Sequence, residues 1–357
     1  MNDFFVTLLL MGALSSGGTL PFWMTSNQFG LMPETSGAMA LARLGSGYDP
    51  SRTLQWRWGA SLAANYGSSA ASSVILSEAK DLEAKDFRPM LDELFASLRW
   101  KVFSADLGLK RFELDYYGAG CQTLGSMSST GGHLIWSGNA RTIPGYTLHL
   151  DPVAVPMTGG HVKLFGAYGD YKTLDDRYMS GALIHRIMAG LDIKITDRLD
   201  FHGEMDHYAL WGGKNDKIQM PVTLGNYFRV ITARGASASG TSSDQINVIG
   251  DQRGSEIFRL DWRGNGWWLS VQHDIPYDDG SGMGFQNRPD GVNTIWFGFD
   301  RKDRWISDFL YEYQYTMFQS GTRHDRPTTE EEKSHLDPSD EYHYNHHIIG
   351  GGDNYFN

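Results

Sequence analysis

The sequence predicts an all-β fold, a large antiparallel transmembrane β-barrel. The clearest sign is a strict two-residue alternation in residues 199–211, where Leu199, Phe201 and Met205 are apolar and the even positions are charged or titratable up to Asp206. Successive side chains of a strand point to opposite faces, so one face is apolar and the other polar. The same alternation recurs in three other segments: 54–66, 258–263 and 309–317.

Composition separates the barrel from a soluble β-sandwich, which buries its apolar face instead of showing it to lipid. Aromatic residues are 13% of the chain, and many lie near the ends of expected strands, among them Trp100, Trp211 and Trp305. Aromatic girdles at the two membrane interfaces account for that placement. No stretch reaches about 18 consecutive apolar residues, which excludes a transmembrane helix.

The first 36 residues are expected to precede the barrel. Residues 4–14 are an apolar run followed by small residues, so 1–16 are expected to be a signal peptide, although an imperfect one without Lys or Arg at its start. Residues 17–36 are aromatic and aperiodic, and we expect an N-terminal plug or periplasmic segment. The barrel domain then spans 37–357, with no linker that divides it.

The strands are expected in this order: 37–48, 53–67, 93–103, 104–116, 132–137, 145–155, 160–173, 182–196, 198–211, 226–235, 256–263, 266–277, 292–300 and 306–319. A short turn at Asp197 joins two of them, whereas 235–255, 278–291 and 322–343 are expected to be longer loops. Residues 68–90 interrupt the alternation with helix-forming residues, and an insertion is favoured over a short helix.

Charge and cysteine content exclude some classes of function. The net charge of −11, without a cluster of Lys and Arg, argues against nucleic-acid binding. Cys121 is the single cysteine, so no internal disulfide is possible. The three histidines His343, His346 and His347 could bind a transition metal, but no supporting motif accompanies them. We expect no metal site and no cofactor.

Two groups of residues are candidates for chemistry or binding. His202, Glu204 and Asp206 share one strand face and could activate water, yet a hydrated network in the lumen is the favoured interpretation, with no catalytic residue. Trp136, Asn139 and Arg141 follow a glycine-rich turn. They could stack on a sugar and donate to its hydroxyl or carboxylate groups, or Arg141 could simply pair with a carboxylate of the wall.

Five segments in chain order carry a resemblance to a known family: 20–31, 131–144, 162–169, 303–312 and 353–357. Together they resemble the Wzi family of outer-membrane capsule-assembly proteins, in the forms found in Bacteroidetes-like bacteria. The resemblance implies an 18-stranded barrel with a plug and a non-enzymatic, lectin-like role. With about 14 strands, the chain is expected to be C-terminally truncated and its barrel incomplete.

The resemblance also implies a bacterial outer-membrane location and a set of partners. The partners are capsular or extracellular polysaccharide, outer-membrane lipid and the polysaccharide export machinery, and the chain is expected to be a monomer that binds no nucleic acid. Two alternatives remain open, a passive outer-membrane porin or channel and an outer-membrane hydrolase that uses the His, Glu and Asp set of the lumen.

Overall fold

The computed structural model describes residues 4–14, 20, 25, 28–33, 35–67, 86–111, 135, 140–174, 179–217, 219, 221–235, 248–277, 285, 290–301 and 305–315. Its elements in chain order are β1 (Phe4–Ala13), β2 (Gly37–Ser46), β3 (Leu54–Gly67), β4 (Asp86–Trp100), β5 (Phe103–Leu109), β6 (Pro144–Ala154), β7 (Val162–Lys172), β8 (Ser180–Lys194), β9 (Leu199–Lys214), α3 (Leu224–Ile231), β10 (Asp251–Arg263), β11 (Trp267–Tyr277), β12 (Gly291–Phe299) and β13 (Asp308–Tyr315).

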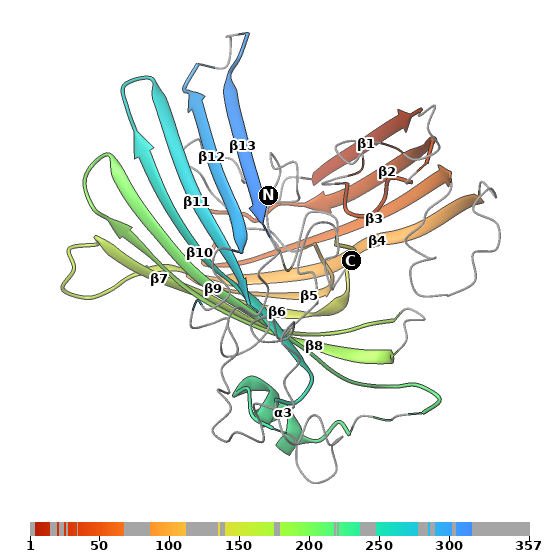
Figure 1. The fold of residues 1–357 in the computed structure, drawn as a ribbon. Coiled ribbons are helices and arrows are strands. Elements are labelled where there is room, and N and C mark those ends of the chain that lie inside the picture. Colours follow the sequence, from red (N-terminus) through yellow and green to blue (C-terminus); the bar gives the residue numbers. More distant parts are fainter. Residues whose placement is uncertain are drawn as a thin grey trace, which may run out of the picture.

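The thirteen strands form one antiparallel sheet in which each strand pairs with its neighbours in sequence, from β1 to β13. Figure 1 shows the sheet curving into a trough with β1 and β13 at its two edges. Within the described part of the chain, no pairing joins these edges, so the sheet is not closed. No described helix is long and apolar enough to cross a membrane. The prediction of an all-β antiparallel fold is confirmed.

The two faces of the sheet differ in polarity, and the polar face is the inner one. On β3, outward-pointing Leu62 is 63% exposed, whereas its inward neighbour Ser61 is 1% exposed. On β5, Leu107 is 67% exposed and Asp106 is 6% exposed. Apolar side chains outside and polar side chains inside are the reverse of a soluble protein and typical of a membrane-spanning barrel.

The connections between strands also differ at the two ends of the sheet. At one end they are two to eight residues long, whereas at the other end they are seven to 36 residues long. Bacterial outer-membrane barrels combine short periplasmic turns with longer extracellular loops. We call these the short-connection end and the long-connection end.

Two segments outside the strands pack on the inner face. Leu31 and Met32 are buried against Met39 and Leu41 of β2, and the Asn65 amide donates to the Leu31 carbonyl at 3.0 Å. Farther along the sheet a second apolar group fills the interior, with these members: Ile135, Ala140, Ile143, Tyr171, Ile184 and Tyr208. The described part of the N-terminal segment therefore contacts the inner side of the wall, and the plug or periplasmic role expected for 17–36 stays a prediction.

One expected strand is wrong. Residues 226–235 were expected to be a strand, but Leu224–Ile231 forms helix α3. Thr223 caps this helix, since its hydroxyl accepts from the Asn226 N–H at 3.1 Å. Asn226 and Val230 are the buried side chains, and their spacing of four residues is that of a helix face.

Other differences concern where strands begin. Phe4–Ala13, expected to be the apolar part of a signal peptide, pairs with β2 along its whole length, and a cleavable leader stays a prediction. Strand β4 begins at Asp86, inside the expected insertion 68–90, and β10 begins at Asp251, inside an expected loop. The expected strand 132–137 and the loop 322–343 lie outside the described residues, except for Ile135.

Candidate ligand-binding lumen

The concave face of the sheet contains a cavity of about 760 Å³, which we call the lumen cavity. Its lining extends from Lys110 and Arg111, beside the long-connection end of β5, to His161 and Lys194 at the short-connection end. The cavity therefore follows the height of the wall. Strand alternation explains its polarity, because every second residue of β3 to β10 points inward.

The lining of the lumen cavity is more basic than the chain as a whole. It includes eight Lys and Arg residues and five Asp residues, in a protein whose net charge is −11. At one end, the guanidinium of Arg57 lies 4.6 Å from the ring centroid of Tyr48, and that of Arg99 lies 5.8 Å from the same centroid. Arg99 also pairs with Asp151. An aromatic ring with two guanidinium groups close to it suits a ligand with flat apolar and anionic parts.

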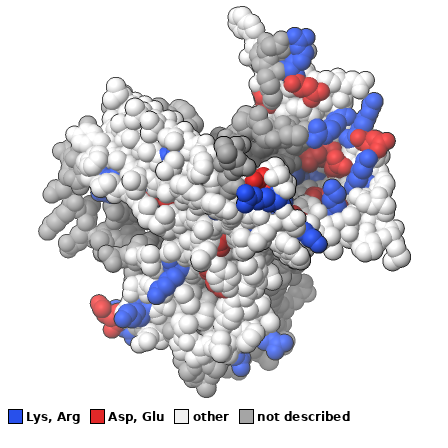
Figure 2. All heavy atoms as spheres, turned by 180° about the vertical axis from the view of Figure 1, so that it is seen from behind, with Lys and Arg blue, Asp and Glu red and all other residues white. Residues whose placement is uncertain are grey.

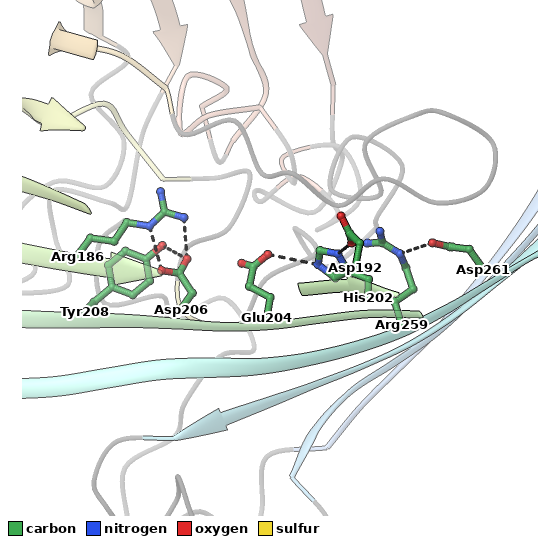
Figure 3. Close-up of polar contacts among 8 residues, drawn as sticks. All are labelled: Arg186, Asp192, His202, Glu204, Asp206, Tyr208, Arg259 and Asp261. Atoms are coloured by element: carbon green, nitrogen blue, oxygen red, sulfur yellow. Dashed lines mark hydrogen bonds and ion pairs between the residues drawn. The ribbon is translucent and has the colours of Figure 1, made fainter. Parts of the chain in front are cut away.

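A row of ion pairs stands on the inner face of β8, β9 and β10 (Figure 3). Arg186 donates to both oxygens of Asp206, at 3.0 Å from Nε and 2.8 Å from Nη2, and the Tyr208 hydroxyl donates to the same carboxylate at 2.6 Å. Toward the short-connection end, Arg259 pairs with Asp261 at 2.9 Å.

Between these pairs, His202 lies in a network of its own. Its Nδ1 is 2.8 Å from Asp192, its Nε2 is 3.4 Å from Glu204, and its ring stacks on Phe165 with centroids 5.2 Å apart. Both ring nitrogens thus face carboxylates, and the ring is held in place on one side by an aromatic face.

The prediction that His202, Glu204 and Asp206 share one face is confirmed by the register of β8 and β9. They do not converge on a common point, because Asp206 is engaged by Arg186 while His202 is engaged by Asp192. His202 lies close to the short-connection end of β9. That these residues form a lumen network and are not catalytic stays a prediction.

A β-bulge adds a second charged cluster on β4. The register with β3 shifts between Ser61 and Leu62, so Asp92 and Glu93 are consecutive and both buried on the inner face. The Ser61 hydroxyl donates to Asp92 at 2.6 Å. Two cations complete the cluster, since Arg43 lies 3.2 Å from Glu93 and Arg111 pairs with Asp92.

Arg141 lies beside this cluster rather than in the lumen cavity. Its guanidinium contacts the Met90 sulfur at 2.7 Å, and it does not belong to the cavity lining. Burial lowers the pKa of Arg141, while the charge of Asp92 raises it and that of Arg111 lowers it. The other two expected ligand-binding residues, Trp136 and Asn139, and the histidines 343, 346 and 347 lie outside the described residues.

The sequence interpretation did not single out Tyr48, Arg99 or Lys110 as ligand-binding residues. The sequence feature that could have indicated such residues is the alternation of each strand, which places basic side chains such as Arg57 and Arg259 on its polar, inward-facing side. Alternation alone could not show which of these positions surround a common cavity, because that depends on the curvature of the sheet.

No protein-family model and no curated protein matches this chain. Among solved structures, it is similar to Acinetobacter baumannii OccAB2, with a TM-score of 0.31 and 11% identity over 77% of this chain and 73% of that one. It is also similar to a mutant porin of Rh. blastica, with a TM-score of 0.28 and 6% identity over 77% of this chain and 88% of that one. For Pseudomonas aeruginosa OpdK with vanillate, the TM-score is 0.29 and the identity 11%, over 74% of this chain and 72% of that one. Values this low do not relate the chain to a family or to a function.

Proposed function

We propose that this chain is the wall of an outer-membrane β-barrel whose lumen binds an acidic capsular or extracellular polysaccharide without catalysing a reaction. The observation that carries the proposal is the basic lumen cavity inside a wall whose outer face is apolar. The outer face favours a membrane location, since lipid-facing strands require apolar side chains. The resemblance to the capsule-assembly family supports the same class of ligand.

The lumen cavity has suitable chemistry for a uronic-acid polymer. Guanidinium groups bind carboxylates through paired, charge-assisted hydrogen bonds, and those of Arg57 and Arg99 both lie close to the ring of Tyr48. Sugars stack their apolar faces on aromatic rings, and two such rings line the cavity: Tyr48, which contacts Arg57 and Arg99, and Phe165, which contacts His202. The length of the cavity along the wall suits an extended chain better than a compact metabolite.

The test is binding of polygalacturonate, with dextran of similar length as the neutral control. The protein is refolded in detergent, and binding is measured by isothermal titration calorimetry. We expect saturable binding of polygalacturonate and none of dextran. Arg57→Gln combined with Arg99→Gln should weaken binding by on the order of tenfold or more, because each charge-assisted contact contributes about 1.5–3 kcal/mol.

The matched control removes two positive charges outside the lumen, Arg229→Gln with Arg234→Gln, both on exposed residues. Heat-modifiable gel mobility verifies that both double variants fold. Equal binding by the Arg57 and Arg99 variant and the unmodified protein would refute a polysaccharide site in the lumen cavity.

A passive channel is the second candidate, favoured by the extension of the lumen cavity between both ends of the wall. The eight basic and five acidic lining residues predict a preference for anions. Single-channel recording in a planar bilayer under a KCl gradient gives the sign of this selectivity. Steady conductance that polygalacturonate does not block would favour the channel over the binding protein.

A further inference from the structure

Helix α3 lies on the outer face of the wall, near its long-connection end (Figure 1). Val230 of the helix is fully buried against Ala209 and Trp211 of β9, and Leu183 of β8 packs on the same cluster. Leu183 shares its strand face with Ile187, which is 38% exposed. The helix therefore covers the outer surface next to the lipid-facing belt, not the lumen.

Polar contacts hold α3 against the outer face of β7 and β8. The Tyr227 hydroxyl donates to Asp170 of β7 at 2.7 Å and contacts the Tyr168 hydroxyl. The other carboxylate oxygen of Asp170 lies 2.9 Å from Nδ1 of His185 on β8. The Tyr146 hydroxyl of β6 also donates to Asp170. Three strands and the helix thus share one carboxylate, which sets the side of α3 that faces the wall.

The opposite side of α3 is apolar and exposed. Leu224 is 78% exposed and Phe228 is 64% exposed, and their spacing of four residues places them on one stripe. Val222, just before the helix, is 56% exposed. Exposed basic residues surround the stripe in sequence: Lys214, Lys217, Arg229 and Arg234. In Figure 2 the lower end of the molecule, where α3 lies in Figure 1, is mostly white with separate Lys and Arg groups and one group of Asp or Glu at the lower left.

We propose that α3 is an interfacial helix that inserts Leu224 and Phe228 into the boundary between acyl chains and anionic phosphate head groups of the outer leaflet. An apolar stripe bordered by basic side chains is the chemistry that such a boundary recognises. The helix packs on Leu183 of β8, and Ile187 on the same face of this strand is an exposed apolar residue of the outer wall. This inference rests on the proposed membrane-spanning wall.

Site-directed spin labelling measures the depth of the helix. Single cysteines replace Phe228, Ile187 and Asp197 in a Cys121→Ser background, because Cys121 is the single native cysteine. The protein is reconstituted in phosphatidylcholine vesicles with or without phosphatidylglycerol. Asp197 is the water reference, since its side chain is 94% exposed in a short turn, and Ile187 is the lipid reference. Collision rates with oxygen and with a soluble nickel chelate report depth.

We expect the label at 228 to collide with the nickel chelate several-fold less often than the label at 197, and with oxygen more often. Equal chelate access at 228 and 197 would overturn the inference. Protection at 228 from both reagents would also overturn it, since a second protein would then cover the stripe. A water-accessible label at 187 would instead refute the membrane-spanning wall itself.

The phosphate part of the inference has a separate readout. The label at 228 should lie deeper in vesicles that contain phosphatidylglycerol than in pure phosphatidylcholine. Arg229→Gln with Arg234→Gln should remove that difference, while Arg198→Gln, an exposed residue of the turn at the short-connection end, should retain it. If the depth of the label at 228 changes neither with lipid charge nor with the paired arginine substitutions, recognition of anionic head groups is overturned.

Discussion

Removal of the Asp206 carboxylate tests whether the buried ion pairs of the lumen contribute to the stability of the folded sheet. Asp206 is 1% exposed and accepts two hydrogen bonds from Arg186 and one from Tyr208. Asp206→Ala deletes the acceptor of all three bonds at once. The Arg186 side chain, 7% exposed, then keeps its charge inside the wall without this carboxylate.

The expected loss follows from the cost of a buried charge without its partner. Breaking one side of a buried ion pair typically destabilises a protein by about 3–5 kcal/mol. The Tyr208 hydroxyl, in a fully buried side chain, loses its bond to Asp206 and adds about 1 kcal/mol. We therefore expect the free energy of unfolding to fall by roughly 4–6 kcal/mol, the sum of these two contributions.

Urea unfolding in phospholipid vesicles, followed by the fluorescence of the 11 tryptophans, measures this change. Removing both charges, by Arg186→Leu with Asp206→Leu, should cost much less than Asp206→Ala, because no lone charge remains. Asp197→Ala is the matched control. It also deletes an aspartate carboxylate, but from an exposed ion pair with Lys194, and it should change stability little.

Two results would contradict this reasoning. A loss below about 1 kcal/mol for Asp206→Ala would mean that water screens the pair as it does at a surface. A double variant as unstable as Asp206→Ala would mean that the shape of the side chains, and not the charge of Arg186, determines the cost.

Three further predictions concern the wall, the helix and a turn. Gly254→Val should prevent folding into the heat-resistant gel form, because a Cβ there would lie 2.3 Å from the Asp206 carbonyl oxygen. Thr223→Ala should destabilise α3 by about 1 kcal/mol, seen as faster local amide hydrogen exchange. The hydrogen bond from Lys194 lowers the pKa of Asp197 below 3.8. The pair therefore stabilises the folded turn fully above pH 3.8, and this stabilisation is lost as the pH falls through the lowered pKa of the folded state. An NMR titration of Lys194→Met should show the pKa of Asp197 returning toward 3.8.

Much of the fold could be predicted from residue order alone. The alternation in 199–211 located β9 (Leu199–Lys214) to within a few residues and assigned His202, Glu204 and Asp206 to one face. The alternation in 54–66 did the same for β3. These predictions succeeded because the side-chain period of a strand is two, whichever partner the strand has.

The predictions that failed lie where local signals compete. Residues 226–235 contain aromatic and β-branched side chains that favour a strand, but the Thr223 cap and burial of Asn226 and Val230 against the wall select a helix. The start of β4 at Asp86 was missed because the bulge at Asp92 interrupts the two-residue period.

The candidate site also has one part that the sequence could predict and one part that it could not. The sequence could identify inward-pointing arginines on single strands, such as Arg57 and Arg259, but it named only Arg141 as a candidate ligand-binding arginine, which the structure places against Met90 instead of in the lumen cavity. Pairing such as that of Arg186 with Asp206 joins β8 to β9 and depends on their register. Register is a property of two strands together, and neither strand alone contains it.

The sequence by itself determined an all-β chain with one apolar and one polar face on each strand, since both follow from residue order and strand geometry. Only the tertiary structure decided which polar residues meet, because curvature gathers side chains from β3 to β10 around one lumen cavity. The tertiary structure also decided the place of α3, which is an isolated short helix in sequence. An eight-residue helix is too short to be stable alone, so its packing on β8 and β9 determines that it forms and which side it exposes.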